Sequence, residues 1–352
     1  MVAIARPDAG PVPVDAELAR EWAALADRTG AVPFSRPGWV EAWARAHDVA
    51  VEALVVRRHG RLTGLLPLVA GRRRAIVPAD WHTPVVEAVA ADDETLEVLG
   101  EALAVAGRVV DLSFVVDSGP TSRVIGAALA AGGFHLRRRS AMDSPYVDLG
   151  GSAASYFDGL DRRKRSELRR RRRRLEEAGS VAFEVHDGSE GLDGLLDEGF
   201  AVEAAGWKAD TGTAIVSAPA TEALYREVAR WASQERMLRL AFVRLDGRPI
   251  AFDYCLEAAG VHYLLKTGFD PGAKRFAPAM HLRAFMIERA FEEGLERYDF
   301  AGDADPWKLE WTSATRSIVR IDAYPPTLRG RTARLADRAR RRARTALRRG
   351  AR

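Results

Sequence analysis

Hydrophobic positions along the chain alternate between two spacings, one typical of helices and one typical of strands. Residues 51–58 and 62–70 are apolar runs rich in β-branched residues, joined by a short turn that contains Gly60. Three further runs of this kind, 238–245, 249–257 and 261–267, follow one another in the second half. Amphipathic helical segments separate these groups, so the pattern predicts a mixed α+β protein.

The two groups of strands resemble each other in sequence. Residues 56–64 match residues 243–251 at an offset of 187 positions, and each copy follows a helix that carries a tryptophan, Trp43 or Trp231. A duplicated core accounts for the helix, the turn and the following strand recurring in order. The alternative is two unrelated hairpins that both use glycine turns.

Charge is distributed unevenly along the chain. The net charge is +4, but residues 329–352 carry eleven Arg against Asp337, and residues 162–177 carry ten basic residues against three Glu. The remaining residues have a net charge of −13. The basic character therefore belongs to two helical segments, and it does not indicate a nucleic-acid-binding body.

Length and composition suit a folded protein of two domains. The 352 residues contain no apolar run long enough to cross a bilayer, and Cys255 is the single cysteine. The first residues lack the pattern of a secretory signal, so we expect a cytoplasmic protein. We expect an N-terminal half over 12–150, an Arg-rich connecting helix over 151–179, a catalytic half over 180–325 and a basic tail over 326–352.

A loop-to-helix junction in the second half is a candidate anion site. Residues 269–279 lead into a helix that begins at Pro278, and proline suits the first helical position. The free N–H groups of such a start, together with the helix dipole, bind phosphate. The residues predicted to bind a phosphate-bearing cofactor are Lys274, Arg275, Ala277, Pro278, Ala279 and Met280; an ordinary junction is the alternative.

Several short motifs, in order along the chain, resemble those of a known family. They are residues 34–39, 65–68, 162–175, 206–208, 266–270, 298–300 and 307–311. On these motifs the chain resembles the CelD-like acetyltransferases, a branch of the GNAT superfamily related to the FemAB-type aminoacyl transferases.

That resemblance implies a fold, a donor and a class of acceptor. The fold is a duplicated GNAT fold with two mixed sheets flanked by helices. The donor is acetyl-CoA or another acyl-CoA, its pantetheine arm lying where one central strand parts from its neighbour, and no metal is required. The acceptor is an amine or hydroxyl of an envelope, polysaccharide or small-molecule precursor. Ala277-Pro278-Ala279 departs from the Ser-Pro-Gly-like segment usual in the family, and the Gly-rich phosphate loop is absent.

Four charged or aromatic residues are candidates for the acceptor side of such a site. Glu203 is a candidate general base, Trp207 a wall of the acceptor pocket, and Lys208 a substrate contact. Lys266, at the end of an apolar strand, is a candidate for stabilising the tetrahedral oxyanion. A helix-end charge pair and the charged end of an edge strand are the respective alternatives.

Further candidates lie in strands and in one turn. Asp253 is a second candidate base, because it is interior to the strand run 249–257, where its side chain points either to the core or to the cleft. Asp299 and Lys308 are candidate catalytic residues, with Asp303 and Trp307 as substrate contacts; the alternative is a buried ion pair that fixes the loop. The scattered carboxylates do not predict a metal site.

The two basic segments suggest partners. The Arg-rich helix and the basic tail can contact an anionic membrane surface or a phosphate-bearing partner. A solvated face on the helix and disorder in the tail are the alternatives. Two other functions stay open: a FemAB-like, tRNA-dependent aminoacyl transferase, and a non-catalytic GNAT-like binding protein of an envelope system.

Overall fold

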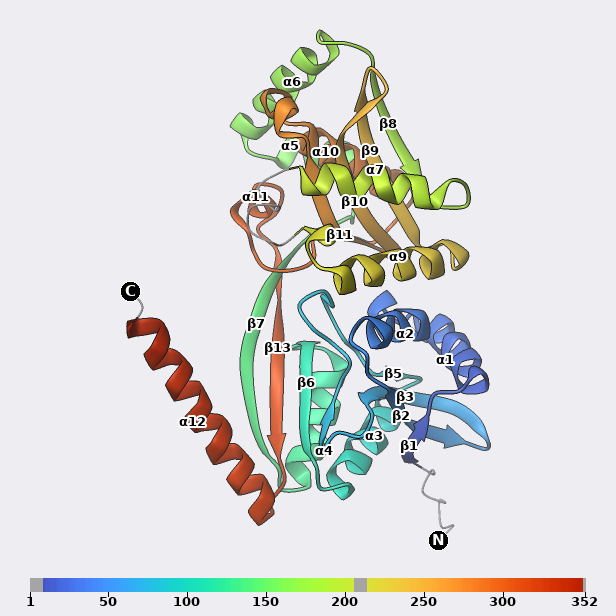
Figure 1. Ribbon diagram of the computed structural model, residues 1–352, viewed down its shortest axis with the longest axis vertical. Coiled ribbons are helices and arrows are strands. Elements are labelled where there is room, and N and C mark those ends of the chain that lie inside the picture. Colours follow the sequence, from blue (N-terminus) through green and yellow to red (C-terminus); the bar gives the residue numbers. More distant parts are fainter. Residues whose placement is uncertain (1–8, 206–213, 351–352) are drawn as a thin grey trace. The chain divides into compact units, whose positions relative to one another are not determined.

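The computed structural model describes residues 9–205 and 214–350, with the side chains of 344–350 left aside. The chain forms two compact units (Figure 1). Unit 1 contains residues 1–40, 49–141 and 317–352, and unit 2 contains residues 41–48 and 142–316.

Unit 1 contains two sheets with helices packed on them. One sheet has the strand order β1-β2-β3-β5, and the other strands of this unit follow the order β4-β6-β13-β7, with β7 contributing residues 135–141. The first half of the chain contributes β1 (Ala9–Pro13), α1 (Ala16–Thr29), α2 (Pro37–Ala46), β2 (Val51–Arg58), β3 (Arg61–Val69), β4 (Arg74–Ile76), β5 (Val89–Ala90), α3 (Asp93–Val105), β6 (Val109–Val116), the π-helical turn Thr121–Ile125, α4 (Gly126–Ala131) and β7 (His135–Asp148).

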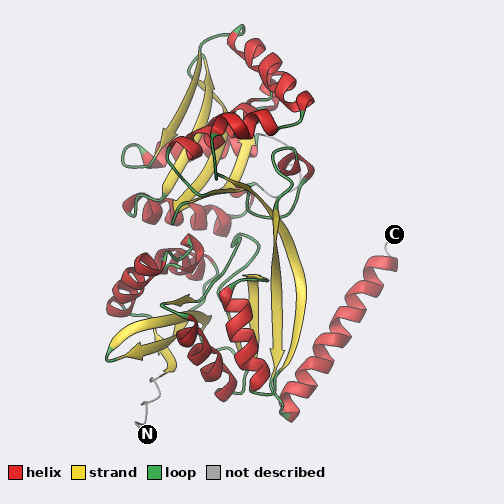
Figure 2. Cartoon of the chain, turned by 180° about the vertical axis from the view of Figure 1, so that it is seen from behind, coloured by secondary structure: helices red, strands yellow, loops and turns green. Residues whose placement is uncertain are grey.

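Unit 2 is built around strands in the order β7-β12-β11-β10-β9-β8. Its helices lie on both sides of these strands (Figure 2). The second half of the chain contributes α5 (Ala153–Gly159), α6 (Arg162–Glu176), β8 (Val181–His186), α7 (Leu192–Ala204), α9 (Pro219–Gln234), β9 (Leu238–Leu245), β10 (Arg248–Ala258), β11 (Val261–Phe269), the 3₁₀ helix η4 (Pro271–Phe276), α10 (Pro278–Glu292), β12 (Arg297–Asp299), α11 (Pro306–Leu309), β13 (Thr315–Tyr324) and α12 (Leu328–Gly350).

The order of elements repeats between the two halves of the chain. The hairpin β2–β3 corresponds to β9–β10, the helix α3 to α10, the strand β6 to β12, and the long strand β7 to β13. The last strand of each half pairs in the unit of the other half, because β7 pairs with β12 and β13 pairs with β6. The duplication expected from the sequence repeat is confirmed, and the exchange of the last strands is an addition to it.

The Arg-rich connecting segment differs from the one expected. The sequence predicted a single helix over 151–179, but the segment forms two helices, interrupted at Leu160 and Asp161. Asp161 is extended and its side chain accepts a hydrogen bond from Arg163 N (2.7 Å), so it caps a new helix.

The two faces of the unit 2 strands are covered by different helices. On β10, Phe252 faces α7, where Gly199 has no room for a Cβ beside the Phe252 ring. The next residue, Asp253, faces α10, where it contacts Arg283. Successive side chains of a strand point to opposite faces, so α7 and α10 lie on opposite sides. This alternation separates the candidate site residues into two groups.

Candidate functional site

The strands β11 and β12 are paired over only three residues. Val261 to Tyr263 pair in parallel with Arg297 to Asp299, and β12 ends there, while β11 continues to Phe269. On its other side β11 pairs with β10 along its length, but with a bulge. Cys255 pairs with Leu264 and Tyr254 pairs with Lys266, so Leu265 is the extra residue. A bulge leaves a residue outside the ladder, and here it lies two residues past the end of the β12 pairing.

A buried arginine joins the three strands where β11 and β12 part. Nη1 of Arg283, on α10, donates to Asp253 Oδ2 (2.6 Å) and to the Tyr298 hydroxyl (2.8 Å). Its Nη2 donates to Asp253 Oδ1 (3.2 Å) and to Thr267 Oγ1 (3.1 Å). Arg283 and Asp253 are almost inaccessible to solvent. Burial opposes the charge of Arg283, but Asp253 and Tyr298 outweigh it and raise the pKa of the guanidinium.

This ion pair changes what Asp253 can do. Both carboxylate oxygens already accept hydrogen bonds from Arg283, and the side chain is fully buried. Neither oxygen is therefore exposed to receive a substrate. The geometry therefore favours a positioning role for Asp253, exerted through Arg283 on β11 and β12.

Asp299 lies at the end of β12 and is also fully buried. Its Oδ1 accepts hydrogen bonds from Ser144 Oγ (3.2 Å) and from Ala301 N (2.9 Å), and Arg316 Nη2 lies 2.6 Å from its Oδ2. The carboxylate thus joins β7, β13 and the loop after β12. The expected partner, Lys308, makes none of these contacts.

Lys308 instead stabilises the loop that follows β12. Its Nζ donates to the carbonyl oxygens of Ala301 (2.7 Å) and Asp303 (2.8 Å), and it lies 3.2 Å from Asp305 Oδ2. Burial lowers the pKa of Lys308, although the charge of Asp305 opposes this. The neighbouring Trp307 ring lies 5.4 Å from the Arg283 guanidinium. Asp303 is exposed at the edge of the same loop.

Two other candidates lie on the α7 side of the sheet. Glu203 is buried, and its Oε2 accepts a hydrogen bond from Ile215 N (3.0 Å). The helix α7 touches β11 directly, because a Cβ on Gly268 would lie 2.4 Å from Glu203 Cα. Lys266 Nζ lies 5.2 Å from the centre of the Tyr225 ring on α9. Glu203 and Lys266 therefore share one side of β11, opposite to Arg283 and Asp253.

Two predicted acceptor contacts, Trp207 and Lys208, lie outside the described residues. Among the described residues, no group of three or more His, Cys, Asp and Glu side chains is arranged to hold a metal ion. None of the described helices has an apolar stretch long enough to cross a membrane.

The start of α10 is cationic and has no side-chain cap. Ala277 occupies the N-cap position in the left-handed region (φ 52°), and Pro278 is the first helical residue. Lys274 and Arg275 are exposed in η4 just before it. Arg171 of α6 donates to the carbonyl oxygen of Arg275 (3.0 Å), which brings the Arg-rich helix to this junction.

The first turn of α10 contains His281, whose pKa is lowered by its surroundings. Burial is the main cause that lowers the pKa of His281 to about 4, and the charges of Arg172 and Arg171 add to it. The helix dipole contributes further positive potential at such a start. Four arginines of the run in α6, at positions 169, 170, 173 and 174, remain exposed. The junction is thus suited to a bound anion.

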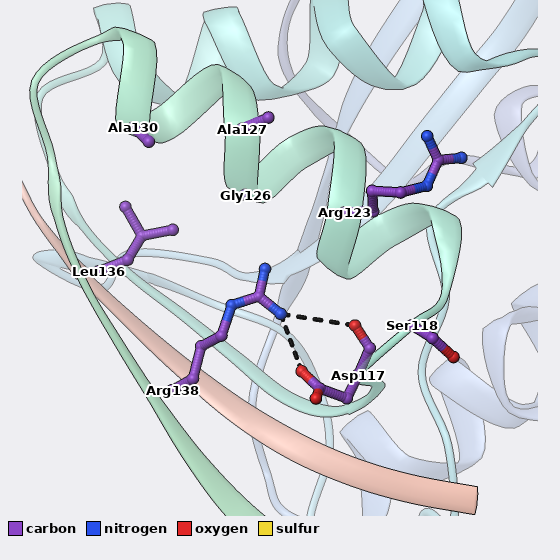
Figure 3. Close-up of a pocket in the computed structure, with 8 residues that line it drawn as sticks. All are labelled: Asp117, Ser118, Arg123, Gly126, Ala127, Ala130, Leu136 and Arg138. Carbon is purple, nitrogen blue, oxygen red and sulfur yellow. Dashed lines mark hydrogen bonds and ion pairs between the residues drawn. The ribbon is translucent and has the colours of Figure 1, made fainter.

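Unit 1 has a shallow surface pocket of its own, bordered by the Thr121–Ile125 turn, α4 and β7 (Figure 3). Arg138 crosses it and donates to Asp117 Oδ1 (2.8 Å) and Ser122 Oγ (2.8 Å). None of the residues predicted from the sequence to form the site lines this pocket. Arg123, which also lines the pocket, donates to Asp93 Oδ2 (2.8 Å).

The sequence alone assigned no role to Arg283, Tyr298 or Thr267, although the last two lie in the motifs 298–300 and 266–270. One signal was present, because Arg283 interrupts the apolar stripe formed by Leu282, Met286 and Ile287 on α10. A charge inside such a stripe requires a buried partner. Asp253, inside the strand run 249–257, is the matching acid, but no local sequence feature links the two positions.

Comparison with a family model and with solved structures identifies the fold of the chain. Residues 162–309 match the model of an acetyltransferase (GNAT) domain. The chain has a GNAT fold. It is duplicated, as the order of elements shows, and so the expected fold class is confirmed.

The solved structures agree over nearly the whole chain. FemX matches with a TM-score of 0.62 at 13% identity, covering 89% of this chain and 96% of FemX. The C-terminal domain of a protein assigned as a lysylphosphatidylglycerol synthetase, from Agrobacterium fabrum, matches with a TM-score of 0.58 at 15% identity, over 92% of this chain and 96% of that one. The structure called L-PGS from Bacillus licheniformis gives 0.56 at 15%, over 90% and 94%. At these identities the likeness concerns the fold alone, and no curated protein sequence matches.

Proposed function

We propose that this GNAT-fold protein transfers an acyl group from acyl-CoA to an amine or hydroxyl of a second substrate. The observation that carries the proposal is the parting of β11 from β12 after Tyr263 and Asp299, beside the start of α10. An extended thioester arm needs an unpaired strand edge, and its diphosphate needs a cluster of positive charge. Unit 2 has both features on adjacent elements.

The bulge in β11 supports a position for the thioester beside this strand, near Leu265. Leu265 stands outside the β10–β11 ladder, at a point where β12 has already ended. We assign the donor for the thioester carbonyl oxygen to a backbone N–H at this bulge. That donor stabilises the oxyanion of the tetrahedral intermediate, and the Lys266 side chain adds positive charge on the same strand.

The reaction then needs no covalent enzyme intermediate. The acceptor nitrogen or oxygen attacks the thioester carbonyl carbon and loses a proton to Glu203 or to a water held by it. The carbon–sulfur bond breaks, the acyl group stays on the acceptor, and the CoA thiolate takes up a proton. Asp253, Asp299 and Lys308 hold the strands and the loop in place, and Asp303, Trp307, Trp207 and Lys208 are proposed acceptor contacts.

The diphosphate is assigned to the junction before α10. Lys274 and Arg275 supply charge, and the backbone of Ala277, Pro278, Ala279 and Met280 forms the helix start. The exposed arginines of α6 lie next to this junction through the contact of Arg171 with Arg275.

The finer assignment rests on the sequence motifs. We place the chain among the CelD-like acetyltransferases, acting in the cytoplasm on an envelope or polysaccharide precursor, because those motifs occur in family order. A FemAB-like transferase that uses charged tRNA, and a binding protein without turnover, remain the two other outcomes of the test below.

Titration calorimetry with acetyl-CoA separates these functions. Binding in the micromolar range, together with release of the CoA thiol when amines or hydroxyls are added, supports acyl-CoA transfer. Binding of acetyl-CoA without any thiol release indicates the binding protein. Absence of acetyl-CoA binding, with binding of aminoacyl-tRNA, indicates the FemAB-like function and overturns the proposal.

Two variants test the site within that experiment. Lys266→Ala removes a half-buried side chain and should abolish thiol release while acetyl-CoA still binds. Arg28→Ala, an exposed arginine in unit 1, is the matched control and should change neither quantity. Full turnover in Lys266→Ala would remove this residue from the mechanism.

A further inference from the structure

The C-terminal helix α12 has two opposite faces of different character. One face is anchored on unit 1. Asp337 accepts hydrogen bonds from Arg74 Nη2 (2.7 Å) and from the Tyr324 hydroxyl (3.0 Å). Gly330 at the helix start has no room for a Cβ, which would lie 2.1 Å from the Pro325 carbonyl oxygen. The helix is therefore an ordered part of unit 1.

The other face of α12 carries two leucines that are exposed to solvent. Leu328 is 79% exposed and Leu335 is 59% exposed. They lie seven residues apart, about two turns, so they share one side of the helix. Thr332, Ala336 and Ala339 fill the side between and beside them, and all three are exposed.

Arginines border this strip on both sides. Arg331, Arg338 and Arg342 follow one edge at helical spacing, and Arg329 and Arg340 follow the other edge; all five are exposed. The one acid of the helix, Asp337, lies on the anchored face, where it contacts Arg74. The outward face is therefore apolar along its centre and wholly positive along its borders.

This combination matches one kind of partner, the surface of an anionic lipid bilayer. A helix lying in the plane of the interface buries its apolar strip among the acyl chains, while long basic side chains reach the headgroup phosphates. Each arginine near a negatively charged leaflet adds to the attraction. Nucleic acid would satisfy the arginines, but it gives the exposed leucines nothing to pack against.

We propose that α12 docks unit 1 on anionic membranes, with Leu328 and Leu335 inserted at the boundary between headgroups and acyl chains. The anchored face, with Asp337 bound to Arg74 and Tyr324, keeps the helix on the protein while it does so. This inference is independent of the acyl transfer, and either can fail without the other.

Flotation of the full chain with lipid vesicles tests the charge of this face. The vesicles are phosphatidylcholine with or without phosphatidylserine, a lipid chosen for its charge. Reversal at three positions, Arg331→Glu, Arg338→Glu and Arg342→Glu, should lower binding to the anionic vesicles by at least about tenfold. Binding to pure phosphatidylcholine should be weak for all variants.

The matched control reverses the same number of charges elsewhere on unit 1. Arg28→Glu, Arg61→Glu and Arg72→Glu alter three exposed arginines outside α12. This control should keep its vesicle binding within about twofold, because long-range attraction is largely screened at physiological salt. Equal losses in both triple variants would overturn the proposal, since net charge alone would then account for binding.

The depth of insertion is measured through a label. Cys255 is buried, so a Leu335→Cys variant offers one accessible thiol for an environment-sensitive dye. Its emission should shift to the blue with phosphatidylserine vesicles but not with duplex RNA or DNA. No shift with vesicles, or tighter binding to nucleic acid than to vesicles, would contradict membrane docking.

Discussion

The helices α3 and α10 occupy the same place in the two halves, but they begin in opposite ways. In α3 the start is closed by an acid, because Asp92 Oδ1 accepts from Thr95 N (2.7 Å). Asp93 and Glu94 add two more acids in the first turn. In α10 the N-cap is Ala277, without a side-chain cap, and the first turn has no acid.

The difference shows which half is suited to an anionic ligand. An acidic, self-capped start is favourable for the helix itself but repels a phosphate. A start preceded by Lys274 and Arg275 attracts one. Of these two corresponding helices, α3 begins with acidic residues, whereas α10 follows two basic residues and has no acid in its first turn.

A second difference lies beneath these helices. Leu66 in β3 stands 187 residues before Asp253, at the offset of the repeat. Leu66 is fully buried in an apolar cluster with Leu96 and Leu99 of α3. The first half therefore fills this place with hydrophobic side chains, whereas the second half fills it with the pair Asp253–Arg283.

The largest expected effect comes from breaking that pair. Arg283→Met leaves the Asp253 carboxylate buried without its partner, which should cost about 3–5 kcal/mol of stability. The double variant Asp253→Leu with Arg283→Met restores the apolar solution of the first half and should recover most of this loss. Urea denaturation of the full chain, followed by Trp fluorescence, measures both.

The pair is also expected to matter for turnover. If it serves only stability, the double variant should retain the full rate of thiol release from acetyl-CoA. We expect a rate reduced well below that of the unaltered chain, because Thr267 and Tyr298 lose the guanidinium that joins β11 to β12. A double variant as unstable as the single one would contradict the comparison with Leu66.

The next effect is the dependence of stability on pH. It involves Glu257, another buried acid of the second half, which corresponds to Ala70 in the first half at the repeat offset of 187. Burial tends to raise the pKa of Glu257, but the hydrogen bond with His262 and the charges of His262, Arg239 and Arg289 lower it to about 2. A lowered pKa stabilises the fold above the unfolded value of about 4.5, and this contribution is lost as the pH falls toward 2.

Glu257→Gln tests this contribution. The unaltered chain should lose about 3 kcal/mol over that acid range through this group, whereas the variant should be less stable at neutral pH and show a flatter acid profile. Denaturation at a series of pH values gives both curves. Parallel curves would mean that Glu257 titrates in the folded protein as it does in the unfolded chain.

Local features of the chain predicted local structure well. The three successive strand runs 238–245, 249–257 and 261–267 and the helix start at Pro278 all lie where the sequence predicts them, to within two residues. Their ends depend on residues within one turn, such as a glycine with positive φ or a proline at the first helical position.

Contacts between residues far apart in the sequence could not be predicted from such local features. The exchange of β7 and β13 joins residues such as Asp148 and Arg297, which are far apart in sequence. The contact of Arg283 with Asp253 crosses two strands and a loop. Lys308 was expected beside Asp299, but carbonyl oxygens of its own loop bind it, and no spacing rule predicts that choice.

Reversing the charge before α10 gives the third effect in size. Lys274→Glu with Arg275→Glu should weaken acetyl-CoA binding by about tenfold to a hundredfold, because two attractive charges become repulsive. Calorimetry at low and physiological salt should show a smaller difference at the higher salt. Glu94→Lys, which makes the start of α3 less acidic, is the matched control and should leave the affinity unchanged.

The smallest effect is on the free energy of unfolding, and it compares substitutions at the N-caps of α3 and α10. Asp92→Ala removes a capping carboxylate, whose pKa is lowered by its hydrogen bonds with Thr95, and should cost about 1 kcal/mol. Ala277→Gly should stabilise by up to about 1 kcal/mol, since a left-handed alanine is strained and glycine is not. Thermal unfolding measures both, and changes of opposite sign are expected. A loss of stability in Ala277→Gly would mean that the greater backbone entropy of glycine in the unfolded chain outweighs the relief of strain. The left-handed conformation of Ala277 would then contribute no net strain to the start of α10.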